Sequence, residues 1–363
     1  MKTIILADIQ AVLAAYIDPY LQTDLFTAKV VNKLSLNVNQ INLELRLGFP
    51  LKYSLDEWLA PLKAGLAASF PDTKINIEVN WQIETHVGQS TLKALPAIKN
   101  IIAVASGKGG VGKSTVAVNL ALALAQEGAQ VGLLDADIYG PSQPTMLGIH
   151  ERPEIQDKKL IIPIEKFGVQ MMSIGLLVDP QTAMVWRGPM ISMAMQQLLN
   201  DTQWQKVDYL IVDLPPGTGD IQLSLAQKVP LTAALIVTTP QDLALADARR
   251  ASAMFQKLNV PVLGVVENMA MHHCSHCGHE EAIFGRGGAD RLAQEYAVEV
   301  LARLPLDARI REQTDSGKPP VVAEPEGPYA KSYRHLALRV AAVLSKQAKD
   351  YSRQFPNIKV EAL

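Results

Sequence analysis

The sequence contains few cysteines, few aromatic residues, little net charge and no long hydrophobic run. Only two of its 363 residues are cysteines, which excludes a fold held together by several disulfides. Aromatic residues make up 6% of the chain and hydrophobic residues of all kinds 48%, so a sizeable core would consist mostly of aliphatic side chains. That balance favours layered α/β architecture over a β-sandwich.

Charge and hydropathy exclude further classes of protein. The 34 basic and 36 acidic residues nearly cancel, which argues against broad binding to nucleic acid or to an acidic membrane surface. No stretch reaches the ~18 consecutive apolar residues of a transmembrane helix. The opening stretch MKTIILADIQAVLAAY has one Lys, an acidic residue among its apolar residues and no small-residue cleavage site, unlike a signal peptide. We therefore expect a soluble, cytoplasmic protein that binds neither nucleic acid nor membrane.

The patterning predicts two domains. In residues 1–82, DIQAVLAAYI and LDEWLAPLKAGLAASF have a helical period, whereas INLELRLGF and KINIEVNWQI alternate as strands do. This stretch should form a small α+β domain. Residues 83–99 are polar and broken by Gly and Pro, which indicates a linker. Residues 351–363 should form a polar tail.

Residues 100–350 have a different rhythm, in which short apolar runs alternate with helical segments. Such alternation predicts an α/β domain with a mostly parallel sheet flanked by helices. We expect helices at 111–126 and 329–349. The expected strands are 101–106, 131–137, 207–215, 232–240, 260–269 and 299–306.

The first of these strands leads into GKGGVGKST, which matches the phosphate-binding pattern G-x-x-x-x-G-K-[ST]. Its glycines let backbone N–H groups converge on phosphate oxygens, and the next helix adds its positive N-terminal end. Lys113 would reach the β- and γ-phosphates, and the Ser114 hydroxyl would ligate Mg²⁺. The residues predicted to bind ATP here are Gly107, Lys108, Gly109, Gly110, Val111, Gly112, Lys113, Ser114 and Thr115.

A second lysine inside the loop, Lys108, is typical of a subgroup. At this place it resembles the deviant Walker A proteins, which include MinD- and ParA-like ATPases and nitrogenase iron protein. The resemblance implies a face-to-face homodimer in which Lys108 reaches the nucleotide of the other subunit. A charge supplied there stabilises the transition state, as an arginine finger does.

Carboxylates follow two of the predicted strands, where ligands of open α/β sheets bind. Asp213 in YLIVDLPPGTGD is interpreted as the Walker B residue, which holds the Mg²⁺ shell through water. Asp137 in VGLLDADIYG is interpreted as the residue that orients the attacking water, and Asp135 as a cap of the loop. PPGTGD would be a switch loop that senses the γ-phosphate.

These motifs occur in one order with four others: WRGPM (186–190), ENM (267–269), C-x-x-C-G and LPLD (304–307). Over about residues 98–345 the set resembles the Mrp/ApbC family of iron–sulfur cluster carriers. The resemblance implies slow ATP hydrolysis in the service of cluster carriage. It also implies that Asn268 hydrogen-bonds the adenine and that Pro305 flanks the base.

Residues 1–82 resemble the small iron–sulfur assembly domain that often precedes this core. That domain commonly has a cysteine near the segment that reads GFPLKYS here, and this chain has none. We therefore expect this domain to dock partners or to regulate the core.

Both cysteines, Cys274 and Cys277, lie in NMAMHHCSHCGH, and three interpretations compete. A dithiol redox pair would sit at a helix start in a smaller fold. A structural zinc would recruit histidines, but such close spacing makes tetrahedral ligation awkward. A [4Fe–4S] cluster wants four thiolates, which two copies of the chain supply. The candidate histidines are His272, His273, His276 and His279.

Since the resemblance at Lys108 independently implies a dimer, the bridged cluster is preferred. The sequence thus predicts a homodimer that binds ATP and Mg²⁺ and carries a labile [4Fe–4S] cluster from donating scaffolds to apo-proteins. One alternative is a MinD/ParA-like positioning ATPase, but the tail contains Pro356 and is no basic amphipathic helix. The other is a zinc-stabilised, ATP-dependent switch.

Overall fold

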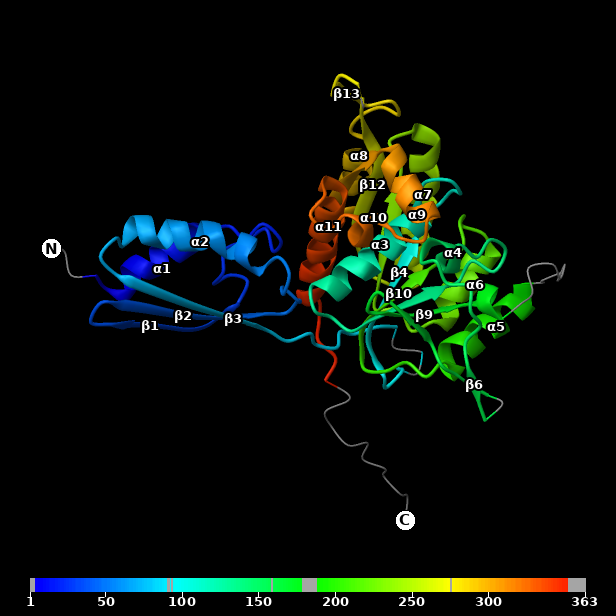
Figure 1. Cartoon of the computed structure of the whole chain (residues 1–363), viewed down its shortest axis with the longest axis horizontal. Coiled ribbons are helices and arrows are strands. Elements are labelled where there is room, and N and C mark those ends of the chain that lie inside the picture. The colour runs from blue at the N-terminus through cyan, green and yellow to red at the C-terminus, as the bar shows by residue number, and fades with distance from the viewer. Residues whose placement is uncertain are drawn as a thin grey trace, which may run out of the picture.

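The computed structural model describes residues 4–89, 92, 94–157, 159–177, 188–274 and 276–351, which form two domains (Figure 1). The predicted α/β fold class with a small α+β domain ahead of it is confirmed. Within these ranges, no helix is both long and apolar enough to cross a membrane.

The N-terminal domain packs two helices on a three-stranded sheet of order β1–β2–β3. β2 runs antiparallel to β1 and parallel to β3. On β2 every second side chain is buried against the helices, as its alternating sequence predicts. The strand β1 was missing from the sequence prediction. The bounds are α1 Leu6–Ala15, β1 Val31–Asn37, β2 Gln40–Leu47, α2 Leu55–Ser69 and β3 Lys74–Trp81.

The second domain is built on a nine-stranded sheet of order β13–β12–β11–β4–β10–β5–β9–β8, with β14 paired to β12. All pairs are parallel except β12–β13 and β8–β9 at the two ends. The strands are β4 Ile98–Ala105, β5 Val131–Asp135, β8 Ile164–Lys166, β9 Val169–Ser173, β10 Val207–Asp213, β11 Ala233–Thr238, β12 Val262–His273, β13 Glu280–Glu281 and β14 Glu299–Leu306; β6 Ile155–Gln156 and β7 Leu160–Ile161 form a separate ribbon.

Helices cover both faces of this sheet, so its strands are buried on both sides. In β4, Ile102 and Val104 face the core shared with α3 and α11, whereas Ile101 and Ala103 face the core shared with α5–α8. The helices are α3 Lys113–Gln126, α4 Gln143–Met146, η1 Ile174–Leu176, α5 Gly188–Asp201, α6 Asp220–Lys228, α7 Asp242–Lys257, α8 Gly288–Tyr296, α9 Ala308–Asp315, α10 Pro320–Ala323 and α11 Pro328–Ser345.

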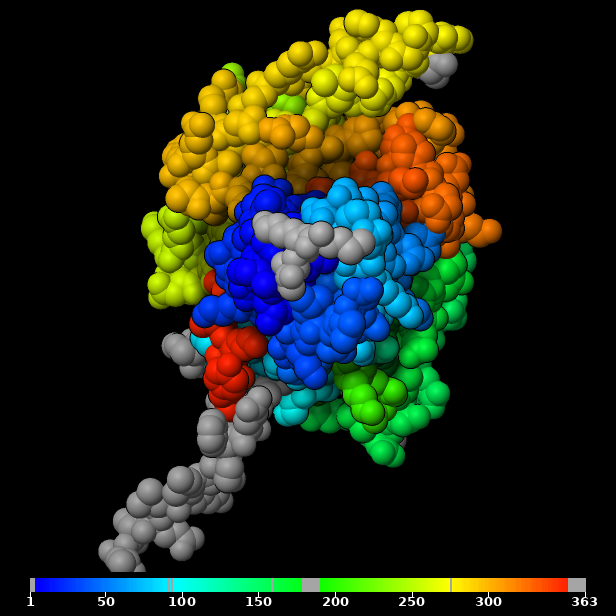
Figure 2. Space-filling model, turned by 90° about the vertical axis from the view of Figure 1, so that its left-hand side faces the viewer, coloured from blue at the N-terminus to red at the C-terminus, as the bar shows by residue number. Residues whose placement is uncertain are grey.

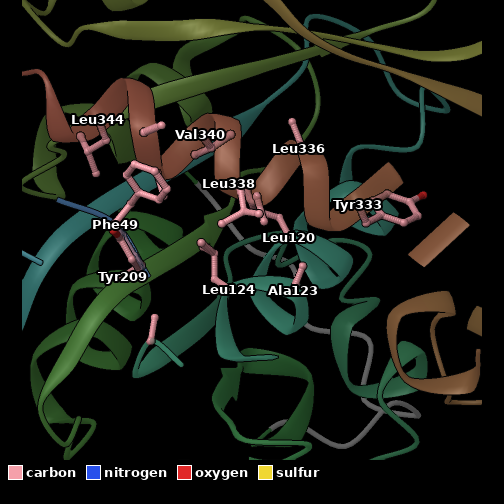
Figure 3. Close-up of a cluster of buried hydrophobic side chains, with 14 of the residues drawn as sticks. Phe49, Leu120, Ala123, Leu124, Tyr209, Tyr333, Leu336, Leu338, Val340 and Leu344 are labelled. Carbon is pink, nitrogen blue, oxygen red and sulfur yellow. The ribbon is translucent and has the colours of Figure 1, made fainter. Parts of the chain in front are cut away.

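The two domains share one hydrophobic core. Phe49 of the N-terminal domain belongs to the same buried cluster as Val340 and Leu344 of α11 and Leu124 of α3 (Figure 3). Polar contacts surround this patch: the Arg339 guanidinium donates to the Tyr20 carbonyl and the Lys346 ammonium to the Leu21 carbonyl. The small domain is therefore docked on α11 and on α3, the helix that follows the phosphate loop.

A buried carboxylate fastens this junction. Glu127, which follows α3 directly, is fully buried and accepts hydrogen bonds from the backbone N–H groups of Tyr53 (3.0 Å) and Ser54 (3.1 Å) and from the Ser54 hydroxyl. Burial raises its pKa, and these donors oppose the rise. Glu127 thus links the end of the phosphate-loop helix to the start of α2.

Replacing Glu127 with Ala should loosen this junction. Since each buried donor left without an acceptor costs about 1–3 kcal/mol, we expect the free energy of unfolding to fall by roughly 3 kcal/mol or more. The control is Glu57→Ala on α2, where the side chain is exposed, with an expected change of at most ~0.5 kcal/mol. Urea unfolding measures both, and equal effects would contradict the assigned role.

Candidate functional site

The segment between β4 and α3 forms the predicted phosphate loop. Gly110 and Gly112 both have φ +83°, a left-handed conformation that favours glycine. Gly107 lies against α7, because a Cβ atom there would come within 2.1 Å of the Asp247 backbone. Val111 is buried, whereas Gly109, Gly110 and Lys108 are exposed. The loop therefore presents its backbone to solvent just ahead of the N-terminus of α3, as phosphate binding requires.

The two lysines of the loop have opposite environments. Lys113 is 5% exposed, and its ammonium pairs with the fully buried carboxylate of Asp213. The ammonium also donates to the Ser114 hydroxyl at 3.2 Å. The Lys108 side chain is exposed. The half-buried Thr115 accepts from Asn119 through its carbonyl.

Gly112 and Gly110 offer a matched test of the loop. An Ala at either position meets the same backbone strain of about 1–2 kcal/mol. At Gly112 its Cβ would also lie 2.2 Å from Asn268 Nδ2, whereas at Gly110 nothing lies within 4 Å. We expect Gly112→Ala to bind a fluorescent ADP analogue about tenfold more weakly than Gly110→Ala, because about 1.4 kcal/mol of clash corresponds to that factor. Equal affinities would show that this contact does not shape the site.

The acidic residues meet at the carboxyl ends of two adjacent strands. Asp135 on β5 lies in register with Asp213 on β10, and both are fully buried. Burial, together with the charge of Asp213, raises the pKa of Asp135. Asp135 accepts from the backbone N–H of Asp137 at 3.1 Å, in keeping with its expected capping role. Asp137 is half-buried and accepts from Gly140 N–H at 3.2 Å; burial raises its pKa, and Lys113 opposes the rise.

Sequence reasoning overlooked one residue of this group, Gln143 at the start of α4. Its Nε2 donates to Asp213 Oδ2 at 2.8 Å and to the Ser114 carbonyl at 3.1 Å. The only signal in the sequence was an amide between Pro141 and Pro144 in the loop after β5.

The expected adenine contacts do not converge on one cavity. Asn268 on β12 is buried and donates through Nδ2 to the Val111 carbonyl at 2.8 Å, so it holds the phosphate loop. Pro305 on β14 pairs with Met271 and lines a cavity of about 530 Å³, in which Asn268 takes no part. Their assignment to the adenine therefore stays a prediction. WRGPM is described only from Gly188 onward, since its first two residues lie outside the described ranges.

The cysteines lie at the tip of the hairpin between β12 and β13, which stands out from the domain (Figures 1 and 2). The turn is closed by hydrogen bonds from Cys274 N–H to the His279 carbonyl and from Gly278 N–H to the Cys274 carbonyl, each 2.9 Å. Both thiols are free; Cys274 is half-buried and Cys277 exposed. Hydrogen bonds from the backbone N–H groups of Cys277 and His276 lower the pKa of the Cys274 thiol.

The neighbouring histidines are partly engaged elsewhere. His272 Nδ1 lies 3.0 Å from the Leu306 carbonyl, and His273 Nδ1 lies 3.3 Å from Glu280. His276 and His279 are exposed. Among the residues that the structure describes, no three His, Cys, Asp or Glu side chains are grouped as a metal site.

The residues present fit a nucleotide with magnesium. The Ser114 hydroxyl and the Asp213 carboxylate are oxygen donors of the kind that Mg²⁺ prefers. Two buried oxygens of residues adjacent in the chain, Gln143 Oε1 and Ser142 Oγ, have no hydrogen-bond partner among the described residues. Buried polar atoms are nearly always paired, so these two suit the waters of a hydrated cation.

Comparison with known families assigns both domains. Residues 97–341 match the model described as NUBPL iron-transfer P-loop NTPase of the ParA group, and residues 6–79 match the iron–sulfur cluster assembly protein domain. The predicted membership of the Mrp/ApbC group and the predicted nature of the N-terminal domain are thereby confirmed.

Similar proteins agree with this result. The iron–sulfur cluster carrier protein of Pseudomonas fragi is 61% identical over 72% of this chain and 92% of its own. That of Escherichia coli K12 is 47% identical over 94% of this chain and 93% of its own. A nucleotide-binding protein of Archaeoglobus fulgidus, solved in complex with ADP, is 37% identical over 65% of this chain and 93% of its own, with a TM-score of 0.56. The chain belongs to the NUBPL-type iron-transfer P-loop NTPases, the Mrp/ApbC family of iron–sulfur cluster carrier proteins, with an iron–sulfur cluster assembly domain ahead of the NTPase core.

Proposed function

We propose that this chain is an ATP-hydrolysing carrier that holds a labile [4Fe–4S] cluster between two copies and passes it to apo-proteins. The observation that carries the proposal is that one strand connects the cysteines to the phosphate loop. In β12, Asn268 is hydrogen-bonded to Val111, and the same strand ends at His273, next to Cys274. The names of the relatives support cluster carriage.

The number of thiols supports a second copy. A [4Fe–4S] cluster takes four thiolate ligands, and this chain has two cysteines, both free and at a projecting tip. A twofold axis beside the hairpin would bring four together. Lys108 is exposed on the phosphate loop, and we expect it to act on the nucleotide of the partner. The number of thiols and the exposed Lys108 are therefore both explained by the same homodimer.

When the nucleotide binds, Lys113 would exchange its ion pair with Asp213 for contacts with the phosphates. The β- and γ-phosphates attract its ammonium away from Asp213, and one oxygen of that carboxylate becomes free to accept hydrogen bonds. Magnesium, when bound, would neutralise phosphate charge, held by Ser114 and by Asp213 through water. Asp137 would orient the attacking water, and Lys108 of the other copy would stabilise the charge of the transition state.

The structural change on hydrolysis would be transmitted to the cysteine hairpin between β12 and β13 through the loops around the phosphates. Gly217, in the PPGTGD loop after β10, donates its N–H to the Ser106 carbonyl beside the phosphate loop at 3.1 Å. A γ-phosphate that pulls on this loop and on Val111 would displace both the dimer surface and β12. Nucleotide binding would thus bias cluster retention against cluster transfer.

A transfer assay tests the proposal. The reconstituted protein is mixed without oxygen with an apo-enzyme whose activity needs a [4Fe–4S] cluster, with and without Mg·ATP. We expect the apo-enzyme to gain activity at a rate that Mg·ATP changes. No activation beyond that by free iron and sulfide would refute the carrier role.

A further inference from the structure

One buried amide connects three parts of the nucleotide site. The Gln143 side chain is fully buried, and its Nε2 contacts both Asp213 Oδ2 at 2.8 Å and the Ser114 carbonyl at 3.1 Å. Its backbone N–H donates to Asp135 Oδ2 at 3.1 Å. Gln143 therefore touches both buried carboxylates and the residue expected to ligate magnesium.

The chemistry of its neighbours fixes the orientation of the amide. A carboxylate oxygen and a backbone carbonyl only accept hydrogen bonds, so the group between them must be the NH₂ of Gln143. The carbonyl Oε1 then faces the other way. It is buried and, within the part of the chain that the structure describes, has no donor; the hydroxyl of the preceding residue, Ser142, also lacks a partner there. Gln143 Oε1 is therefore an unused acceptor at the nucleotide site, and a bound ligand could supply its donor.

We propose that Gln143 is a positioning residue for the hydrated magnesium ion of the nucleotide site. The inference rests on the proposed function and adds a residue to that same site. Nε2 fixes Asp213 through Oδ2, so that Oδ1, which pairs with Lys113 in this structure, faces the cation once Lys113 turns to the phosphates. Oε1 accepts from a water of the cation's hydration shell. Gln143 thus contributes to magnesium binding without touching the nucleotide.

The test measures how much magnesium strengthens nucleotide binding. The dissociation constant of a fluorescent ADP analogue is determined with excess Mg²⁺ and with EDTA, for wild type, Gln143→Leu and Gln143→Asn. Magnesium binding is measured by the dissociation constant in EDTA divided by that in Mg²⁺. We expect this ratio to fall about tenfold or more in both variants, because hydrogen bonds to charged groups are among the stronger ones. Affinity in EDTA should stay within about threefold of wild type. Gln143→Asn keeps a shorter amide at the buried site, so this variant should still fold and provide the test if Gln143→Leu does not fold.

Gln170→Leu is the matched control. Gln170 on β9 is also buried, but its amide is hydrogen-bonded to the backbone of Gln205. Its replacement should lower the melting temperature and leave the magnesium ratio unchanged. Gln143 variants with the wild-type ratio, or with equal losses in Mg²⁺ and EDTA, would overturn the inference and leave the proposed function standing. A wild type that binds no nucleotide would refute the proposed function itself.

Discussion

Replacement of Cys274 or Cys277 by Ala is expected to abolish cluster binding. After anaerobic reconstitution, the wild type should hold about four iron and four sulfide per two chains. Each single variant leaves two thiolates per dimer, too few for a stable cluster. Iron and sulfide content and the visible absorbance of the cluster measure the loss. Because both side chains lie at an exposed tip, neither change should alter the melting temperature of the cluster-free protein by more than a few degrees.

The histidines of the same hairpin provide the control. His276 and His279 are exposed and are not ligands in the bridged arrangement, so His276→Ala and His279→Ala should keep full iron and sulfide. A Cys₂His₂ zinc site that used His276 or His279 would instead lose its metal in the corresponding variant. One zinc per chain with no iron, or a full cluster in Cys274→Ala, would contradict the account.

Loss of either lysine of the phosphate loop should reduce ATP hydrolysis by about 100-fold or more, for different reasons. Lys113→Ala removes the phosphate ligand and leaves the buried Asp213 carboxylate without its cation, so nucleotide affinity and stability should both fall; breaking a buried pair costs about 3–5 kcal/mol. Lys108 is exposed. Lys108→Ala should therefore keep its stability and lose only turnover. Hydrolysis rates, ADP affinity and urea unfolding separate the two.

Mixing the two variants tests whether Lys108 acts across the dimer. In a mixed dimer, the subunit that keeps Lys113 receives Lys108 from its partner and has one complete site. At equal concentrations, activity should recover to roughly a quarter of wild type, because about half of the dimers are mixed and each has one of two sites. No recovery after verified subunit exchange would place Lys108 at the nucleotide of its own chain.

The sheet of the large domain could be predicted where apolar runs are continuous, as in β4, β5, β10 and β11. Less regular strands could not. β1 has no fully buried side chain, and β9 is a short strand held between β5 and β8. β12 runs to His273, beyond the predicted 260–269, since it continues past Met269, whose φ is +57°, to pair with β13 and β14. Pairing partners distant in the sequence decide such cases.

The same distinction applies to the site. Lys113, Ser114 and Asp213 could be found because a local motif specifies their surroundings. Gln143 and Glu127 could not, because each acts on residues far along the chain, Asp213 in one case and Ser54 in the other. Nothing in their own neighbourhoods distinguishes them from ordinary surface-loop or helix-end residues.

Native mass spectrometry of the anaerobically reconstituted wild type tests the central claim most directly. The account predicts a species with twice the mass of the chain plus a single [4Fe–4S] cluster, and a return to cluster-free protein in Cys277→Ala. A monomer that carries the whole cluster, or a dimer with one zinc in each chain, would contradict it.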